Sequence, residues 1–264
     1  MKSSFSIAIL CSIVALSLGA CKKGPDVPMP ETNCRITSFT YTIPLNSTPY
    51  SGIVSYNNDG NPSAVKISPV FTASPHATFF YDKHKRLTDH IGVYGAQTDP
   101  SNLPDKITFE YWVRFIYADE NPSSLPIGDT LYVIGNYTKG GPILASSTTI
   151  ESFVYDAQGR IIQVTASSNF PTRTYTYDAN GNLVLPNVVY DTRKNPRQTN
   201  KVWMLVDKNF SKNNPVVATQ YNAEGFPTLF PAPDPQHYPD DFVRRSVVFK
   251  TIDYDCATAK QPVK

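Results

Sequence analysis

Hydrophobic and polar residues alternate along much of this 264-residue chain, with the period of two that a half-buried β-strand requires. In the stretch 106–117, for example, Phe109 and Val113 fall on one face and Glu110 and Arg114 on the other. The alternation predicts a strand over 106–117, and further strand candidates cover 35–43, 130–137, 148–155, 201–207 and 246–254. No stretch of ten or more residues combines a helical period with helix caps, so we expect an all-β chain.

A seven-residue motif recurs between these strands. Its clearest copies cover 155–161 and 177–183, with close relatives at 56–62 and 221–227 and copies with lysine in place of glycine at 81–87 and 190–196. Each copy places a tyrosine at the end of a strand, then an aspartate or asparagine that opens a type I turn. A glycine in the left-handed conformation then closes the turn, so Gly159 and Gly181 are expected at positive φ. Each copy therefore predicts a β-hairpin.

The hairpins together predict one curved antiparallel meander, open to rolling into a partial barrel or sandwich, within a single domain over 33–264. The 16 tyrosines, 14 phenylalanines and 23 prolines suit short strands joined by proline-rich loops, which we place at 98–104, 121–126 and 231–239. Because a hairpin needs a packing partner beside its turn, we interpret the repeat tyrosines as part of the core. They are Tyr56, Tyr155, Tyr177 and Tyr221.

The motif resembles the YD-repeat (RHS-like) family of β-hairpin repeats, and more closely the repeat-bearing lipoproteins of Bacteroidetes whose function is unassigned. The resemblance covers most of 56–230, with uneven spacing between copies, and includes the stretch 199–203 together with 213–215. Long arrays of this family wind into a shell around a toxin. About half a dozen copies are too few for such a shell, so the resemblance implies a small hairpin array instead.

The N-terminus carries a separate signal. Lys2 precedes an uncharged stretch over 5–18, and the run Leu18-Gly19-Ala20-Cys21 then resembles the lipobox of bacterial lipoproteins. The resemblance implies that residues 1–20 are a signal peptide and that Cys21 receives the lipid. Residues 21–32 would then form a flexible tether, and the absence of aspartate at position 22 points to the outer membrane, on either its periplasmic or its extracellular face. The open alternative is an ordinary secretory signal.

Two of the four cysteines remain for structural use once the leader is removed. Cys11 leaves with the signal peptide and Cys21 is taken by lipid, whereas Cys34 precedes the first predicted strand and Cys256 follows the last. The envelope outside the inner membrane is oxidising, so we predict a Cys34–Cys256 disulfide. The alternative is a pair of free buried thiols.

Catalytic, cofactor and metal sites find no support in the sequence. The densest group of candidate metal ligands lies at 234–241 and includes His237, but its spacing fits no calcium-loop or zinc pattern. The net charge of +2 and the charged fraction of 17% do not suggest nucleic-acid binding. Exposed aromatic side chains would suit sugar rings, and the first candidates for ligand contact are Tyr111, Trp112, Tyr132, Tyr137 and Trp203.

Three functions therefore compete. The leading hypothesis is a membrane-tethered envelope lipoprotein that acts without catalysis, as an interaction or scaffold module for another envelope protein. The second is a glycan-binding surface lipoprotein that uses the aromatic candidates. The third is a hydrolase whose carboxylate pair is remote in sequence and hence invisible to motif analysis.

Overall fold

The computed structural model describes residues 33–43, 46–70, 75–95, 104–167, 170–186, 188–215, 218–231 and 248–256. The predicted signal peptide, the predicted lipid attachment at Cys21, the predicted tether and the acidic cluster around His237 all lie outside these ranges.

The described residues form a single antiparallel sheet of thirteen strands, in the order β10-β9-β8-β7-β6-β5-β4-β3-β2-β1-β13-β12-β11. This order confirms the predicted curved meander of hairpins. The strands are β1 Cys34–Ile43, β2 Asn46–Tyr56, β3 Pro62–Ser68, β4 His76–Tyr81, β5 Leu87–Val93, β6 Lys106–Ile116, β7 Gly128–Thr138, β8 Ile143–Tyr155, β9 Ile161–Ala166, β10 Arg173–Thr174, β11 Gln220–Tyr221, β12 Pro227–Leu229 and β13 Val248–Cys256.

One predicted strand is wrong. Residues 201–207 form the α-helix α1, Lys201–Asp207, which follows the short 3₁₀-helix η1, Pro196–Thr199. Asn200 caps the helix, because its side-chain oxygen accepts a hydrogen bond from the backbone N–H of Val202 at 2.9 Å. A short continuous apolar run fits a buried strand and a buried helix equally well, so periodicity alone could not decide between them.

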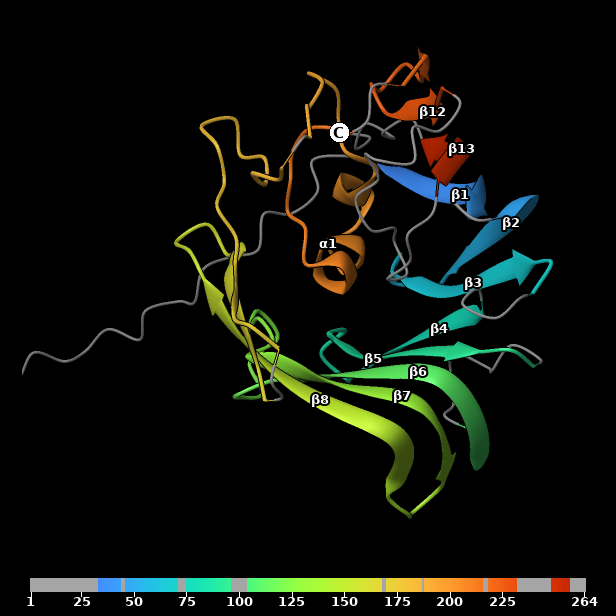
Figure 1. Ribbon diagram of the computed structural model, residues 1–264, viewed down its shortest axis with the longest axis vertical. Helices are drawn as coiled ribbons and strands as arrows, with labels where there is room; N and C mark the ends of the chain where they lie inside the picture. Colours follow the sequence, from blue (N-terminus) through green and yellow to red (C-terminus); the bar gives the residue numbers. More distant parts are fainter. Residues whose placement is uncertain are drawn as a thin grey trace, which may run out of the picture.

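The sheet curves around α1, which lies inside the hollow of the curve (Figure 1). The five residues from Val202 to Val206 are all buried and belong to one apolar core with side chains from both ends of the sheet. Trp203, for example, packs edge-on against Phe79 of β4, with ring centroids 5.6 Å apart. The five residues between the charged ends of α1 are all apolar, as is expected of a helix segment that is buried within a core.

A second, smaller apolar cluster lies on the opposite face of β5, β6 and β7. Ile91, Trp112 and Tyr132 are cross-strand neighbours and therefore point to the same side of the sheet. Their neighbours His90, Val113 and Leu131 point the other way, toward α1. The middle of the sheet is thus buried on both faces.

The repeat turns share one hydrogen-bond pattern. In five copies the side-chain Oδ1 of the aspartate or asparagine accepts the backbone N–H groups two and four residues later; these residues are Asn57, Asp82, Asp156, Asp178 and Asn222. The predicted left-handed glycines are confirmed, with φ of 74° at Gly159 and 82° at Gly181. Lys85 occupies the same position with φ of 63°, although a lysine disfavours this conformation.

This comparison predicts opposite effects of two substitutions on the free energy of unfolding. Gly159→Ala should destabilise the fold by about 1–2 kcal/mol, because a Cβ is disfavoured at positive φ. Lys85→Gly should stabilise it by several tenths of a kcal/mol, since its ion pair with Asp59 is exposed and contributes little. Urea midpoints measure both changes. Equal effects of the same sign would contradict the turn assignment.

The predicted disulfide is present between Cys34 and Cys256, which are cross-strand partners of β1 and β13. It joins the first and last described strands, 222 residues apart in sequence. Because the first and last strands pair here, the edges of the sheet are β10 and β11 instead of β1 and β13.

Tyrosine hydroxyl groups link successive hairpins. The phenolic O–H of each of these tyrosines donates to an acceptor on a neighbouring hairpin or loop, at 2.5 to 3.2 Å; the pairs are Tyr56 to Ile36 O, Tyr81 to Pro62 O, Tyr117 to Leu87 O, Tyr155 to Pro126 O, Tyr177 to Ile161 O, Tyr190 to Leu183 O, Tyr221 to Asp191 Oδ2 and Tyr254 to Pro227 O. We call these eight residues the tyrosine belt.

The belt closes on itself even though the sheet does not. In most links the accepting residue is the direct cross-strand partner of another belt tyrosine, as Leu87 is of Tyr81. The last link is of the same kind, because Tyr56 donates to Ile36, whose partner is Tyr254. The gap between the two sheet edges is bridged by the degenerate copy at Tyr190 and Asp191. At the turn end, the described residues therefore form a closed circuit around α1.

Arginine side chains reinforce this circuit at two copies. The guanidinium of Arg86 lies 4.2 Å from the ring centre of Tyr117, and that of Arg160 lies 4.1 Å from the ring centre of Tyr177. In both cases the Nε group also donates to the turn aspartate of its own copy, Asp82 or Asp156. Each arginine thus links its own turn to the next tyrosine by a cation–π contact and a charge-assisted hydrogen bond.

Burial raises the pKa of all eight belt tyrosines above its ordinary value. The folded chain therefore keeps phenolic protons that the unfolded chain loses above about pH 10. The belt's contribution to stability is complete below about pH 10 and is lost as the pH rises further. Urea unfolding at increasing alkaline pH, followed together with phenolate absorbance, should show both changes in one transition. Phenolate absorbance from the belt in a chain that is still fully folded would contradict this.

A matched pair of variants tests a single link of the belt. Tyr117→Phe removes a hydroxyl that donates to the carbonyl of Leu87 at 3.0 Å, and should lower the free energy of unfolding by about 1 kcal/mol. Tyr132→Phe is the control, because the Tyr132 hydroxyl has no hydrogen-bond partner among the described residues. Equal urea midpoints for the two variants would show that the link adds nothing.

Candidate functional site

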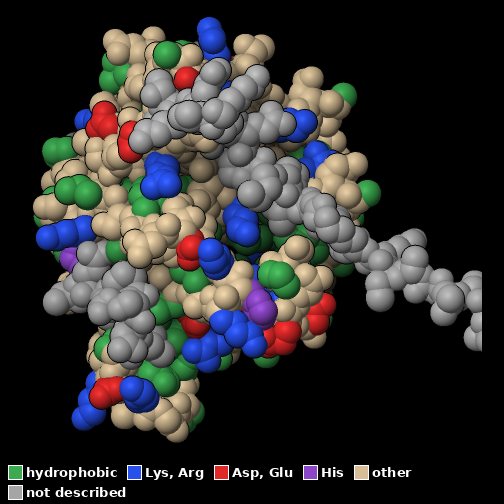
Figure 2. Space-filling model, turned by 180° about the vertical axis from the view of Figure 1, so that it is seen from behind, with side chains coloured by type: hydrophobic (Ala, Val, Ile, Leu, Met, Phe, Trp, Pro, Cys, Tyr) green, Lys and Arg blue, Asp and Glu red, His purple; other side chains and the backbone are tan. Residues whose placement is uncertain are grey.

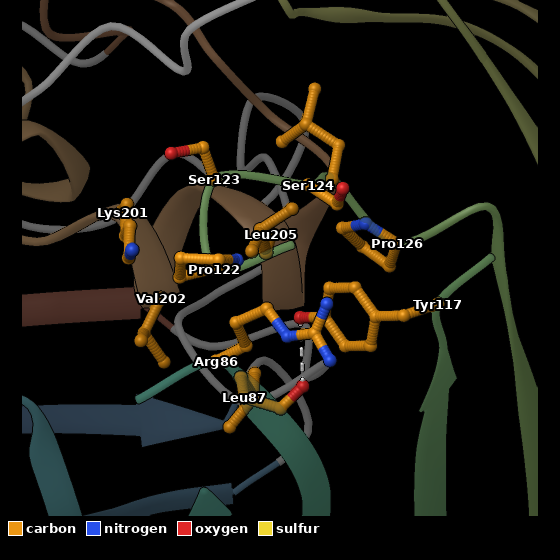
Figure 3. Close-up of a pocket in the computed structure, with 11 residues that line it drawn as sticks. Arg86, Leu87, Tyr117, Pro122, Ser123, Ser124, Pro126, Lys201, Val202 and Leu205 are labelled. Atoms are coloured by element: carbon orange, nitrogen blue, oxygen red, sulfur yellow. Dashed lines mark hydrogen bonds between the residues drawn. The ribbon is translucent and has the colours of Figure 1, made fainter. Parts of the chain in front are cut away.

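A pocket of about 290 Å³ opens between α1 and the loop that leads from β6 to β7 (Figure 3). Leu87 at the start of β5 and Tyr117 of the belt line one side, and Val202 and Leu205 of α1 line the other. Pro122, Ser123, Ser124, Leu125 and Pro126 form the loop side, and Arg86 and Lys201 complete the lining. Most of these surfaces are apolar, as is usual in ligand pockets.

Arg86 holds the pocket together and is not available to a ligand. Its Nε donates to Asp82, and its Nη1 donates to the backbone carbonyls of Asp119 at 2.8 Å and Asn121 at 3.0 Å. The flat side of the same guanidinium lies over the ring of Tyr117. The side chain is buried and its donors are largely satisfied, so Arg86 fixes the loop to the repeat turn.

The loop that forms the pocket rim is ordered by its own polar groups. Asp119 Oδ1 accepts hydrogen bonds from the Asn121 N–H at 3.0 Å and from the Ser124 hydroxyl. These two bonds, led by the one from Ser124, lower the pKa of the Asp119 carboxyl. Asn121 Oδ1 in turn accepts the N–H of Ser123. The predicted loop at 121–126 thus has a defined shape and does not depend on a ligand for it.

Lys201 is the charged group of this pocket that remains open to a ligand. It is half-buried at the first position of α1, and burial lowers the pKa of its amine. Within the described part of the chain, no carboxylate forms an ion pair with it. A half-buried amine without a partner in an apolar pocket favours a ligand with a negatively charged group. Such a group would replace the interactions with water that the amine loses on burial.

The predicted ligand-contact aromatics do not form an exposed row, which corrects that hypothesis. Trp112 and Trp203 have 0% and 1% of their surface exposed. Trp112 donates its indole N–H to Asp89 at 2.6 Å, and Trp203 is part of the helix core. The reason is physical: the centre of β6 is covered on both faces, so alternation there does not distinguish an outer from an inner side.

The three tyrosine candidates are only partly buried, but they too pack inward. The hydroxyl of Tyr111 hydrogen-bonds His90 Nε2 at 3.0 Å. Tyr137 lies edge-on against Trp112, with ring centroids 5.3 Å apart, and Tyr132 packs against the same second cluster. The structure therefore places Trp112, Tyr132 and Tyr137 in the second cluster, whereas Tyr111 and Trp203 belong to the core around α1.

The described residues hold no metal-binding cluster and no membrane-spanning helix. They contain no group of three or more histidine, cysteine or acidic side chains placed to hold a metal ion. Their histidines have structural partners; His76, for example, accepts the backbone N–H of Ile67 at 3.0 Å. No helix in this part of the chain has the length and apolar character needed to cross a membrane.

The surface seen from behind the view of Figure 1 shows no field of a single sign. Lys and Arg side chains lie beside Asp and Glu at several places on this face (Figure 2). Lys83, for instance, pairs with Glu120 at 2.9 Å on an exposed turn. Such pairs are screened by solvent and are worth little individually.

Sequence reasoning missed Lys201, because the stretch 201–207 was assigned to a strand. A signal was present, however. Asn200 is a favoured N-cap residue. It follows Pro196 and the polar residues Gln198 and Thr199, which do not fit the pattern of a buried strand. A helix start at this point would have placed Lys201 in the first turn, next to the core.

Comparison with known proteins supports the repeat and little beyond it. The RHS repeat family matches residues 155–185, the stretch that holds the two clearest copies. Among solved structures, the chain is similar to the TcdB2-TccC3-Cdc42 complex, with a TM-score of 0.19, and to a Tc holotoxin pore of Photorhabdus luminescens, with a TM-score of 0.20. Identity is 14% in both cases, over 58% of this chain and 8% of the other.

The chain thus spans only 8% of the length of each of these solved chains. No curated protein matches the sequence. The chain carries an RHS repeat at 155–185, and the family match covers these residues alone.

Proposed function

We propose that this chain is a lipid-anchored envelope protein of the Bacteroidetes lipoprotein type whose folded body is a non-catalytic interaction module. The observation that carries the proposal is the pocket with its unpaired amine, Lys201, on a rigid closed body. The RHS repeat at 155–185 is consistent with a repeat used for binding.

The hollow of the sheet does not enclose a space that could hold another molecule. The residues of α1 from Val202 to Val206 fill the hollow of the sheet and are buried there. A long repeat array encloses space by winding further, whereas this array closes after a single circuit. A partner would therefore bind from outside, and the pocket beside Lys201 is the recess that offers both apolar surface and charge.

Glycan binding has lost its main support. It rested on an exposed row of aromatic side chains, and Trp112 and Trp203 are buried. A hydrolase would require a carboxylate pair in a cleft, and the pocket lining contains no acidic side chain. An interaction module is thus the function that the described surface supports best, with a partner that presents an acidic group beside an apolar one.

The interaction is tested by photo-crosslinking in cells that carry the full-length protein. A photoreactive residue at Ser123, on the pocket rim, should capture a discrete partner, and Lys201→Gln should reduce that product at least several-fold. The control position is Ser146 on β8, which is also exposed but is not part of the pocket lining. The same products from both positions, or no effect of Lys201→Gln, would contradict the proposal.

Anchoring is a separate prediction and rests on the run Leu18-Gly19-Ala20-Cys21. Mature protein extracted from membranes should begin at Cys21 and carry its lipid, as measured by intact mass. Cys21→Ser should leave the membrane fraction, since the acyl chains supply the binding free energy. A Cys21→Ser protein that stays membrane-bound with an unchanged mature mass would contradict lipidation.

A further inference from the structure

A buried ionic cluster joins the end of α1 to strands β7 and β8. Lys208 Nζ lies 2.9 Å from Asp129 Oδ2 and also contacts Glu151 Oε2. Lys208 is 4% exposed, Asp129 0% and Glu151 9%. Arg173 Nη2 contacts the other oxygen of Glu151 at 2.6 Å, from the more exposed side of the cluster. An amine between two carboxylates is thus held out of water at a contact between a helix and two strands.

The backbone fixes these three groups in place. Asp129 of β7 and Glu151 of β8 are direct cross-strand partners, so their side chains leave the sheet on the same side. Lys208 ends α1 in the left-handed conformation, with φ of 53°, and its N–H donates to the carbonyls of Leu205 and Met204. A lysine seldom adopts this conformation, so the surrounding contacts must hold it there.

An aromatic ring helps to close this cluster off from water. The ring of Phe153 lies 5.1 Å from Lys208 Nζ and covers the amine from one side. Because the pair is held out of water, a proton can pass directly from the ammonium of Lys208 to the adjoining carboxylate of Asp129. Glu151 differs from Asp129 in its contacts, because the guanidinium of Arg173 holds its other oxygen.

We infer that Lys208 and Asp129 join in an intramolecular amide bond, with Glu151 as the proton-transferring group. The ammonium of Lys208 passes one proton to the carboxylate of Asp129, and the resulting amine attacks the carboxyl carbon of Asp129, so that the Nζ–C bond forms. Glu151 takes a proton from the attacking nitrogen and delivers it to the departing hydroxyl of Asp129. The C–O bond breaks and one water leaves, so atoms and charge balance and no oxidant or cofactor is needed.

The fold holds the amine and the carboxyl group next to each other, whereas in free solution they meet only rarely. Holding the reacting atoms in contact raises their effective concentration by many orders of magnitude. The product would covalently fasten α1 to β7, two elements that are 79 residues apart between Lys208 and Asp129. A helix that fills the hollow of the sheet would then remain in place even when the sheet opens.

Mass spectrometry of a tryptic digest of the full-length protein, reduced and alkylated, tests this directly. The linked protein should yield peptide 115–139 joined to peptide 202–212, lighter by one water than the two together, because trypsin does not cleave after an acylated lysine. Peptide 202–208, which requires a free Lys208, should be absent or minor. Recovery of 202–208 and of unlinked 115–139 as the main products from folded wild-type protein would overturn the inference.

Two variants separate the role of Glu151 from a general effect of charge. Glu151→Gln should reduce the linked product at least tenfold in protein that still folds, as judged by a cooperative urea transition. Glu110→Gln, on neighbouring β6, is the matched control and should leave the linked product unchanged. A fully linked Glu151→Gln protein would show that this carboxylate takes no part in the proton transfer, and would overturn that assignment.

Discussion

A buried phenol must keep a hydrogen-bond acceptor, and for each tyrosine of the belt the acceptor comes from a neighbouring hairpin or its loop. Each hairpin therefore needs the next one in place before its own tyrosine is satisfied. Tyr117 depends on Leu87, and Tyr56 depends on Ile36 beside Tyr254. Since the last link returns to the first, no hairpin lies at a free end of the circuit. The closed tyrosine belt turns a repeat architecture, normally an open chain of neighbours, into one body.

Closure also explains the helix inside the sheet. A sheet that curves into a closed circuit leaves a hollow, and apolar side chains on its inner face must be covered. Five consecutive apolar residues of α1 meet this requirement, with Trp203 against Phe79 at the centre. Where the helix begins, Lys201 remains beside the loop that Arg86 fastens, and a pocket is left. The candidate binding site is thus a consequence of how the hollow is filled.

The turns and the disulfide could be predicted because their signals are local or countable. Aspartate followed by glycine determines the turn geometry within five residues, and two cysteines flanking the terminal strands have few alternatives. Trp112 could not be placed, because alternation loses its meaning in a strand that is covered on both faces. The helix α1 could not be predicted either, because its short apolar run fits a buried strand as well as a buried helix. The belt was invisible since its links, such as Tyr221 to Asp191, join residues through space and leave no spacing rule.

Amide hydrogen exchange of Tyr190→Phe tests the closed circuit most directly, because the Tyr190 hydroxyl bridges the gap between the two sheet edges at Leu183. In a closed circuit, loss of this one link should lower protection in β4 and β5, on the far side of the sheet, together with β11 and β12. In an open array, the loss would stay among the immediate neighbours of residue 190. Unchanged protection of β4 and β5 beside exposed local amides would contradict the account.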